Sequence, residues 1–189
     1  MKRLLIVVDY QNDFVDGSLG FEGAELLDER IAAKINEYHQ NGDYVFYTMD
    51  SHTSNYLNTQ EGRSLPITHC VEGTQGWELY GKTAEAILDR DKMFRKPTFG
   101  SAKLFEYLNG AQASAMQAGL DRPYTSIELV GLVSNICVVS NAVIAKSACP
   151  DVPVIVDASC TDSSDKKLHE AALDVLEGLQ VKVVNRNAD

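Results

Sequence analysis

The feature that most constrains the fold of this chain is a regular alternation of short apolar runs with longer segments of helical period. The first run, residues 4–8, reads LLIVV. An unbroken apolar run rich in β-branched residues is typical of a strand buried on both faces. Such runs predict strands at residues 4–8, 44–49, 92–94, 127–132, 154–156 and 181–184. Apolar residues at helical spacing predict helices at residues 24–41, 84–89, 101–108, 136–148 and 165–179.

Strands that alternate with helices predict an α/β protein, because a helical crossover returns the chain in the same direction and makes neighbouring strands parallel. We expect one Rossmann-like, three-layer α/β/α domain with a mostly parallel sheet over residues 1–189. Residues 51–76 have no clear period. A loop of this length in a compact domain is usually functional.

Composition excludes several classes of protein. With 27 acidic against 17 basic residues, the formal net charge is −10, which argues against a nucleic-acid partner. No stretch approaches the ~20 apolar residues of a membrane span. Four cysteines are too few for a disulfide framework, and Asp9 interrupts the N-terminal apolar run where a signal peptide would continue. We therefore expect a cytoplasmic protein with free thiols and no membrane partner.

Sites in parallel sheets form beyond the carboxyl ends of the strands. This rule selects three places: Asp9, residues 50–52 and residues 131–137. Cys137 lies in the last of them, at a strand-to-helix turn. A thiol in the first turn of a helix faces unpaired N–H groups and the positive end of the helix dipole, which lower its pKa and can also receive an oxyanion. A small apolar residue packing the start of a helix gives the same pattern, so both interpretations stay open.

Asp9 ends a wholly apolar strand, where a carboxylate is costly without a partner or a role. Lys96, in the segment RKPTFGS, is a candidate cationic partner. The alternative is that Asp9 caps a turn and that Lys96 is a solvated loop cation. For Lys96 considered alone, the solvated cation is the preferred interpretation.

The long loop carries four potential metal ligands: Asp50, His52, Glu61 and His69. An Asp-x-His pair after a strand can offer two ligands to one ion, and a later Glu and His can complete a mixed site for Zn²⁺, Mn²⁺ or Fe²⁺. The spacing matches no general zinc motif. The other two histidines, His39 and His169, fall at polar positions of predicted helices, and we interpret both as surface residues.

Together these segments resemble the isochorismatase-like cysteine hydrolase superfamily, and within it the nicotinamidase-related enzymes. The matching blocks are LLIVVDYQNDF (4–14), DSH (50–52), LPITHCVEGTQG (65–76), Lys96 and GLVSNICV (131–138). They extend over nearly the whole chain, and the joint occurrence of the Asp, Lys and Cys blocks is specific to the superfamily. The resemblance implies a catalytic triad of Asp9, Lys96 and Cys137. It also implies an oxyanion hole from the backbone N–H groups of Val133 and Cys137, with a cis peptide bond between Leu132 and Val133.

Nicotinamidases of this superfamily bind a divalent ion. The resemblance therefore implies a metal, in the first place Zn²⁺, held by Asp50, His52, Glu61 and His69. Asn58 stands where other relatives have a third histidine. Leu65 and residues 97–101 differ from the residues that line the ring pocket in nicotinamidases. These differences affect the expected substrate more than the expected mechanism. Phe14 and Trp77 are candidate pocket aromatics, with packing in the core or a loop as the alternative.

The resemblance implies a cysteine amidohydrolase that cleaves a small carboxamide to carboxylate and ammonia through a thioester. Nicotinamide is the first candidate substrate, which would place the enzyme in pyridine nucleotide salvage. One alternative is a related cysteine hydrolase acting on a ureido, carbamoyl or other small amide. The other is a non-catalytic binding or assembly protein. The partners expected from the resemblance are a small amide and further copies of the chain, in a homo-oligomer that is a dimer or a tetramer.

Overall fold

Six parallel strands form a single sheet in the computed structural model, which describes residues 1–186. The strands are β1 (Lys2–Val8), β2 (Tyr44–Asp50), β3 (Lys92–Lys96), β4 (Tyr124–Leu132), β5 (Val154–Asp162) and β6 (Lys182–Val184). Their order across the sheet is β3-β2-β1-β4-β5-β6. The predicted α/β class and parallel sheet are confirmed. Residues 187–189, the end of the predicted domain, lie outside the described part.

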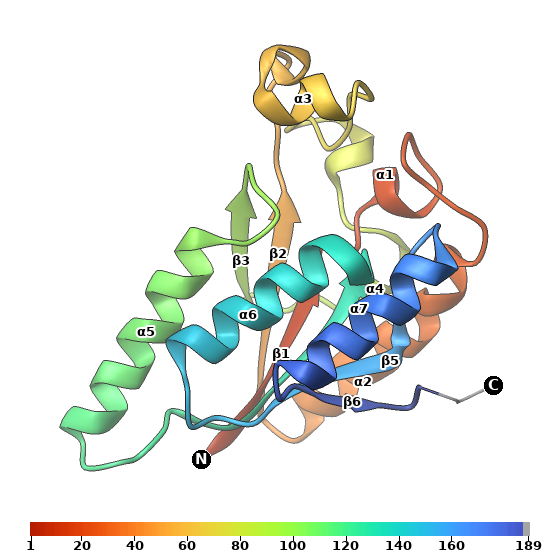
Figure 1. Cartoon of the computed structure of the whole chain (residues 1–189). Helices are drawn as coiled ribbons and strands as arrows, with labels where there is room; N and C mark the ends of the chain where they lie inside the picture. Colours follow the sequence, from red (N-terminus) through yellow and green to blue (C-terminus); the bar gives the residue numbers. More distant parts are fainter. Residues whose placement is uncertain (187–189) are drawn as a thin grey trace.

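Helices cover both faces of the sheet, as Figure 1 shows. In β1, Leu4 and Ile6 pack into one apolar cluster, Leu5 and Val7 pack into another, and all four are 0% exposed. This alternation explains why the run is apolar without interruption. The first cluster contains side chains of α5 (Ala102–Gln117), α6 (Val139–Ala148) and α7 (Lys166–Gly178), and the second contains side chains of α2 (Asp28–Gln40).

Three predicted helix ends are confirmed in detail. Ser101 caps α5 by accepting a hydrogen bond from Leu104 N, and Asp165 caps α7 by accepting from the backbone N–H groups of residues 167 and 168. Gly42, just beyond α2, has a φ of +69°, the left-handed conformation that glycine adopts most readily.

Other predicted boundaries were wrong by a few residues or more. The helix predicted at 24–41 begins with a 3₁₀ turn, η1 (Ala24–Leu27), before α2, and the helix predicted at 101–108 continues to Gln117. The helix predicted at 84–89 is α4 (Gly81–Glu85). The strand predicted at 154–156 continues to Asp162 as β5, and it includes Cys160.

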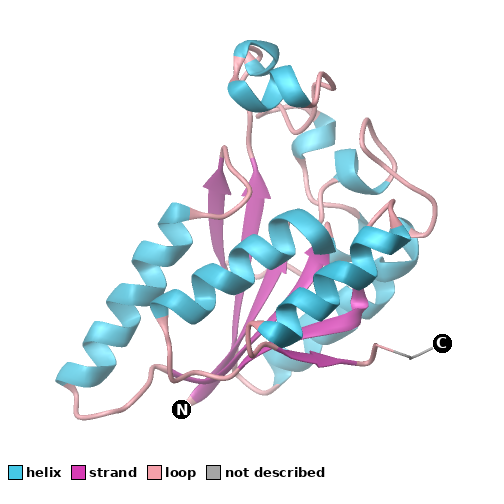
Figure 2. Ribbon diagram, in the orientation of Figure 1, coloured by secondary structure: helices cyan, strands magenta, loops and turns pink. Residues whose placement is uncertain are grey.

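The long segment after β2 is mostly loop but contains short helices (Figure 2). They are the 3₁₀ turns η2 (Tyr56–Asn58) and η3 (Gln75–Trp77) and the short helix α3 (Gln60–Ser64). Near the N-terminus, α1 (Asn12–Val15) is a further short helix. The segment lies beyond the carboxyl end of β2 (Figure 1), where the sequence places the candidate metal ligands. Among the described residues, none of the helices combines the length and apolar character needed to cross a membrane.

Gly131 permits a close approach between β1 and β4 next to the candidate site. Its φ is +108°, and a Cβ at this position would lie 2.1 Å from the carbonyl oxygen of Val8. Only glycine fits both the conformation and the space. Gly131 therefore lets β4 lie close against the end of β1, just before the chain reaches the turn that contains Cys137.

Candidate active site

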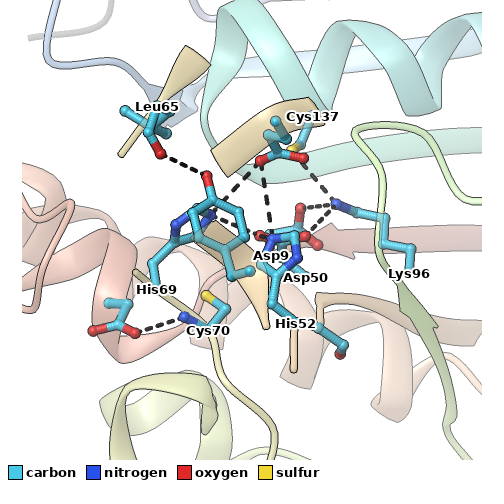
Figure 3. A network of polar contacts seen from close by, with 12 residues as sticks. Asp9, Asp50, His52, Leu65, His69, Cys70, Lys96 and Cys137 are labelled. Carbon is cyan, nitrogen blue, oxygen red and sulfur yellow. Dashed lines mark hydrogen bonds and ion pairs between the residues drawn. The ribbon is translucent and has the colours of Figure 1, made fainter. Parts of the chain in front are cut away.

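The candidate catalytic residues meet because of the strand order at the carboxyl edge of the sheet. Asp9 follows β1, Lys96 ends β3, and β2 lies between them with Asp50 at its end. Asp50 and Lys96 are partners in the strand register. Cys137 lies in the turn that follows β4, the other neighbour of β1. Four segments far apart in sequence thus deliver their polar side chains to one place (Figure 3).

Asp9 is completely buried and is held from two sides. Its Oδ1 accepts a hydrogen bond from Thr48 Oγ1 at 2.7 Å, and its Oδ2 lies 2.6 Å from Lys96 Nζ. Its φ is +44°, and its backbone N–H donates to the carbonyl oxygen of Thr48. Burial raises the pKa of Asp9, and the charge of Lys96 opposes that effect without reversing it. A carboxyl group with a raised pKa is suited to accept and return a proton.

Lys96 is 2% exposed, so the interpretation of this residue as a solvated loop cation was wrong. Its Nζ lies 2.6 Å from Asp9 Oδ2, 3.5 Å from Cys137 Sγ and 3.7 Å from Asp50 Oδ1. Burial alone lowers the pKa of a lysine, but the neighbouring charges of Asp9, Cys137 and Asp50 outweigh it and raise the pKa of Lys96. The ammonium group is therefore a fixed positive charge between the two candidate reacting groups.

Cys137 lies in a π-helical turn, η4 (Ser134–Val138), that leads into α6. The preceding peptide bond, Leu132–Val133, is cis, as the resemblance implies. Burial, and next the charge of Asp9, raise the pKa of the Cys137 thiol, whereas Lys96 lowers it. The net direction is opposite to the lowered pKa predicted from the helix start, because desolvation outweighs the cation. The cysteine also belongs to the apolar core, so it packs the helix start and faces Lys96 as well.

Asp50, His52 and His69 bring three potential ligand atoms within 4.8 Å of one another. Asp50 Oδ2 lies 3.0 Å from His52 Nε2 and 3.2 Å from His69 Nε2. A tetrahedral ion with bonds of about 2.1 Å separates its ligand atoms by roughly 3.4 Å. His69 Nδ1 lies 2.8 Å from the carbonyl oxygen of Ile67, and this hydrogen bond leaves Nε2 as the ligand atom. The donor set and its spacing therefore fit a divalent ion.

Backbone pairing explains how ligands from a loop meet at the end of a strand. A single bridge joins His52 to Val71, which brings His69 alongside. Gln11 holds Asp50 by accepting from its backbone N–H and donating to its carbonyl oxygen, at 2.8 and 2.9 Å. Burial raises the pKa of Asp50, but hydrogen bonds from the two histidines and the charge of Lys96 bring it below its usual range. The carboxylate is therefore ionised, as a metal ligand must be.

Glu61, the predicted fourth ligand, lies farther away. Its Oε1 is 3.9 Å from His52 Nε2 and 3.9 Å from His69 Nε2. Asn58 is exposed, and its side chain donates to Asn55. Leu65 contributes its carbonyl oxygen as the acceptor for the Tyr56 hydroxyl, at 3.0 Å. Of these residues, Glu61 is the one near the cluster of Asp50, His52 and His69. It lies on the side of the cluster that faces a cavity, here called the open side.

A cavity of about 300 Å³ opens beside the cluster. It is lined by Ser51, His52, Thr53, Tyr56, Thr59, Gln60, Glu61, Pro97 and Thr98. Neither Phe14 nor Trp77 is among these residues. Phe14 lies in the core with its ring 5.6 Å from that of His69, and Trp77 donates from its indole nitrogen to Ser51 Oγ. The structure thus places Phe14 against His69 and Trp77 against Ser51, and neither aromatic lines this cavity. A larger cavity, of about 820 Å³, lies elsewhere and contains none of the candidate site residues.

Sequence reasoning missed several residues that support the site. Thr48 and Gln11 hold Asp9 and Asp50, and Tyr56 lines the cavity with its ring 4.6 Å from that of His52. A polar residue inside an apolar strand was the available signal for Thr48. His39 and His169 are not free surface residues, because His39 pairs with Asp91 and His169 contacts Ser134.

Comparison with known proteins identifies relatives over most of the chain. The sequence profile of the isochorismatase domain matches residues 3–188. An uncharacterized isochorismatase family protein of Bacillus subtilis is 33% identical over 146 residues, which cover 76% of this chain and 78% of the relative. The nicotinamidase/pyrazinamidase of Mycobacterium tuberculosis is 27% identical over 190 residues, which cover 96% of this chain and 98% of the relative. The crystal structure of the nicotinamidase/pyrazinamidase PncA from Bacillus subtilis has a TM-score of 0.79 at 26% identity, covering 97% of this chain and 99% of that chain.

The fold and these relatives define the class of protein: a hydrolase built on a parallel α/β sheet. The match over almost the whole chain makes the assignment more specific: the chain belongs to the isochorismatase family.

Proposed function

We propose that this protein is a cysteine amidohydrolase that converts a small carboxamide, with nicotinamide as the first candidate, to the carboxylate and ammonia. The observation that carries the proposal is the position of Lys96 Nζ, 2.6 Å from Asp9 and 3.5 Å from Cys137 Sγ. A base, a buried cation and a thiol in contact are the groups that thioester chemistry needs.

In the proposed reaction, Asp9 takes the proton of the Cys137 thiol as the sulfur attacks the amide carbon. Lys96 stabilises the negative charge that forms on sulfur. The N–H groups of Val133 and Cys137 receive the oxyanion, and one such donor typically contributes about 10²–10³ in rate. Asp9 then gives its proton to the leaving nitrogen, and ammonia departs. The thioester is hydrolysed by a water molecule whose proton goes to Asp9, and that proton finally returns to the sulfur.

Asp50, His52 and His69 would hold a divalent ion, in the first place Zn²⁺, with Glu61 at its open side. When bound, such an ion would supply Lewis-acid chemistry next to the cavity. The chain's own contribution is to keep these donors preorganised: Gln11 fixes Asp50, and the carbonyl oxygen of Ile67 fixes the ring of His69.

The cavity supports a neutral amide over a ureido acid. Its lining includes Tyr56, Pro97 and several hydroxyl or amide groups, and its charged member is Glu61. Among the residues that line it, neither a lysine nor an arginine is present to bind a substrate carboxylate. A heteroaromatic ring fits this composition, and the relative from Mycobacterium tuberculosis carries the description nicotinamidase/pyrazinamidase.

The test is ammonia release from nicotinamide, pyrazinamide and N-carbamoylglycine by the purified protein with Zn²⁺ or Mn²⁺ supplied. We expect release from the two aromatic amides and at least tenfold less from the ureido acid. Release from N-carbamoylglycine alone would replace nicotinamide with the ureido alternative. Release from none of the amides, combined with no preferential alkylation of Cys137, would favour the non-catalytic alternative. Light scattering on the same preparation tests the expected dimer or tetramer.

A further inference from the structure

His169 is a partly buried histidine beside the turn that carries Cys137, and the proposed reaction does not use it. It lies in the first turn of α7, its side chain is 12% exposed, and its Nδ1 is 2.9 Å from Ser134 Oγ. Ser134 is the first residue of the π-helical turn and is completely buried. One hydrogen bond therefore joins α7 to the turn Ser134–Val138, called the nucleophile turn below, although the two residues are 35 positions apart in the chain.

The ring of His169 has several charged side chains around it. Asp162 ends β5, is the register partner of Leu132, and places Oδ1 3.7 Å from His169 Nδ1. The other charged groups that act on the ring are Lys166, Glu170 and Arg186. Burial lowers the pKa of His169, so the ring is neutral near neutral pH. In either neutral tautomer, the Ser134 hydroxyl is the hydrogen-bond partner of Nδ1.

Packing alone does not account for this polar pair. Replacing both partners of a buried hydrogen bond by apolar groups of the same shape is close to neutral for stability. What a directional bond adds is a fixed position for Ser134. That position sets the amide of Val133, one residue earlier, and the thiol of Cys137, three residues later.

We propose that His169 is a positioning residue for the nucleophile turn, which it holds in register with Asp9 and Lys96 through Ser134 Oγ. The inference rests on the proposed hydrolase function for the reaction that the turn serves. Misplacement of a reacting group by about 1 Å can cost on the order of 10² in rate. The cavity wall is built from other segments, residues 51–61 and 97–98, so the effect falls on kcat and leaves KM nearly unchanged.

The experiment compares five variants, each assayed for kcat and KM with nicotinamide and for thermal midpoint. His169→Leu and Ser134→Ala each remove the bond, and the double variant removes both partners. His169→Asn is the conservative rescue, because its side-chain amide reaches the position of Nδ1. His39→Leu is the matched control. His39 is also a helical histidine, its side chain is 8% exposed, and its Nε2 lies 3.0 Å from Asp91 Oδ1. This pair is not part of the turn that contains Cys137.

We expect His169→Leu and Ser134→Ala each to lower kcat by about 10- to 100-fold, with KM within twofold. The double variant should lose no more than the worse single variant, because both changes remove the same contact. His169→Asn should recover most of kcat. His39→Leu should lower the thermal midpoint and leave kcat per folded molecule unchanged. A kcat within twofold of the wild type in both single variants would overturn the proposal, and so would losses that multiply in the double variant.

A second readout needs no substrate. Hydrogen exchange of the amides of residues 133–138 should accelerate in His169→Leu and Ser134→Ala, but not in His39→Leu. If the wild-type protein hydrolyses no amide, the proposed function fails, yet this exchange still decides whether His169 holds the turn. Unchanged exchange in both variants would refute the positioning role in an active or inactive protein alike.

Discussion

Asp50 Oδ1 lies 3.7 Å from Lys96 Nζ, while the other oxygen of the same carboxylate faces His52 and His69 at 3.0 and 3.2 Å. One carboxylate thus joins the candidate nucleophile cluster to the candidate metal cluster. A positive charge bound at the histidines would compete with Lys96 for the charge of Asp50. The two clusters are therefore electrostatically linked, and changes in one should be measurable in the other.

Cys137→Ala should abolish ammonia release and leave the fold intact, because the small side chain fits the space of the thiol. In the wild-type protein, iodoacetamide should modify Cys137 before the other cysteines. Cys137 is 5% exposed and lies beside Lys96, whereas the others are 0–2% exposed: Cys70, Cys149 and Cys160. Mass spectrometry of digests over time measures the order. Faster modification of another cysteine would contradict the assignment of the nucleophile.

Lys96→Met should abolish activity and destabilise the fold by about 3–5 kcal/mol, because it leaves the buried carboxylate of Asp9 without its cation. Urea denaturation measures the loss. Lys82→Met is the control, since Lys82 pairs with Glu29 on the exposed surface and its loss should leave the midpoint unchanged. Equal losses of stability in the two variants would show that the buried Lys96–Asp9 pair contributes no more than the exposed Lys82–Glu29 pair.

His69→Ala should reduce bound Zn²⁺ from about one ion per chain to a small fraction, because three converging donors become two. Glu61→Ala should weaken binding less, since Oε1 lies 3.9 Å from each histidine nitrogen. Elemental analysis after dialysis gives the metal content, with His39→Ala as the control. Full metal content in His69→Ala would remove His69 from the ligand set.

Acid should destabilise the protein partly through Asp157. Burial raises the pKa of this carboxyl, but hydrogen bonds from Lys34, Ser159 and Asn185 outweigh burial and lower it. A lowered pKa in the folded state contributes stability that is complete above the unfolded value of about 3.9. That stability is lost as the pH falls through the folded value. Urea midpoints between pH 2.5 and 6 should therefore vary less in Asp157→Asn than in the wild type, and Lys34→Met should reduce the same slope.

Gly131→Ala should destabilise the fold by at least about 3 kcal/mol, because the new Cβ would lie 2.1 Å from Val8 O at a φ of +108°. Gly110→Ala is the matched substitution inside α5, where nothing lies within 4 Å of the added atom. It should stabilise by up to about 1 kcal/mol through helix propensity. Thermal denaturation of both variants measures these changes in stability. A small loss of stability in Gly131→Ala would show that β1 and β4 can move apart to accept the added Cβ.

The sequence pattern predicts the sheet well because the central strands β1, β2 and β4 are buried over most of their length and so read as apolar runs. The same logic leads to Asp9 and Asp50, which stand where those runs stop. It does not reveal the burial of Lys96. That burial follows from the pairing of β3 with β2, which places Lys96 opposite Asp50. The strand predicted at residues 92–94 ends before Lys96, so the sequence pattern supplied no strand register from which the burial of Lys96 could be inferred.

The remaining differences come from contacts between distant segments. His169 looks like a surface residue on its own helix, and only the packing of α7 against the nucleophile turn brings it to Ser134. The raised pKa of the Cys137 thiol likewise depends on burial and on Asp9, neither of which is visible in the local turn motif. Sequence periodicity describes one element at a time, so it cannot supply these contacts.

The segment after β2 builds most of the cavity wall, whereas Asp9, Lys96 and Cys137 are held by the edge of the sheet. In the proposed function, substrate recognition and bond cleavage would therefore fall to separate stretches of polypeptide. Changes confined to residues 53–60 would then alter which amide is selected without disturbing Asp9, Lys96 and Cys137. A lineage with this arrangement can acquire new substrates by remodelling one loop, while the sheet preserves the chemistry.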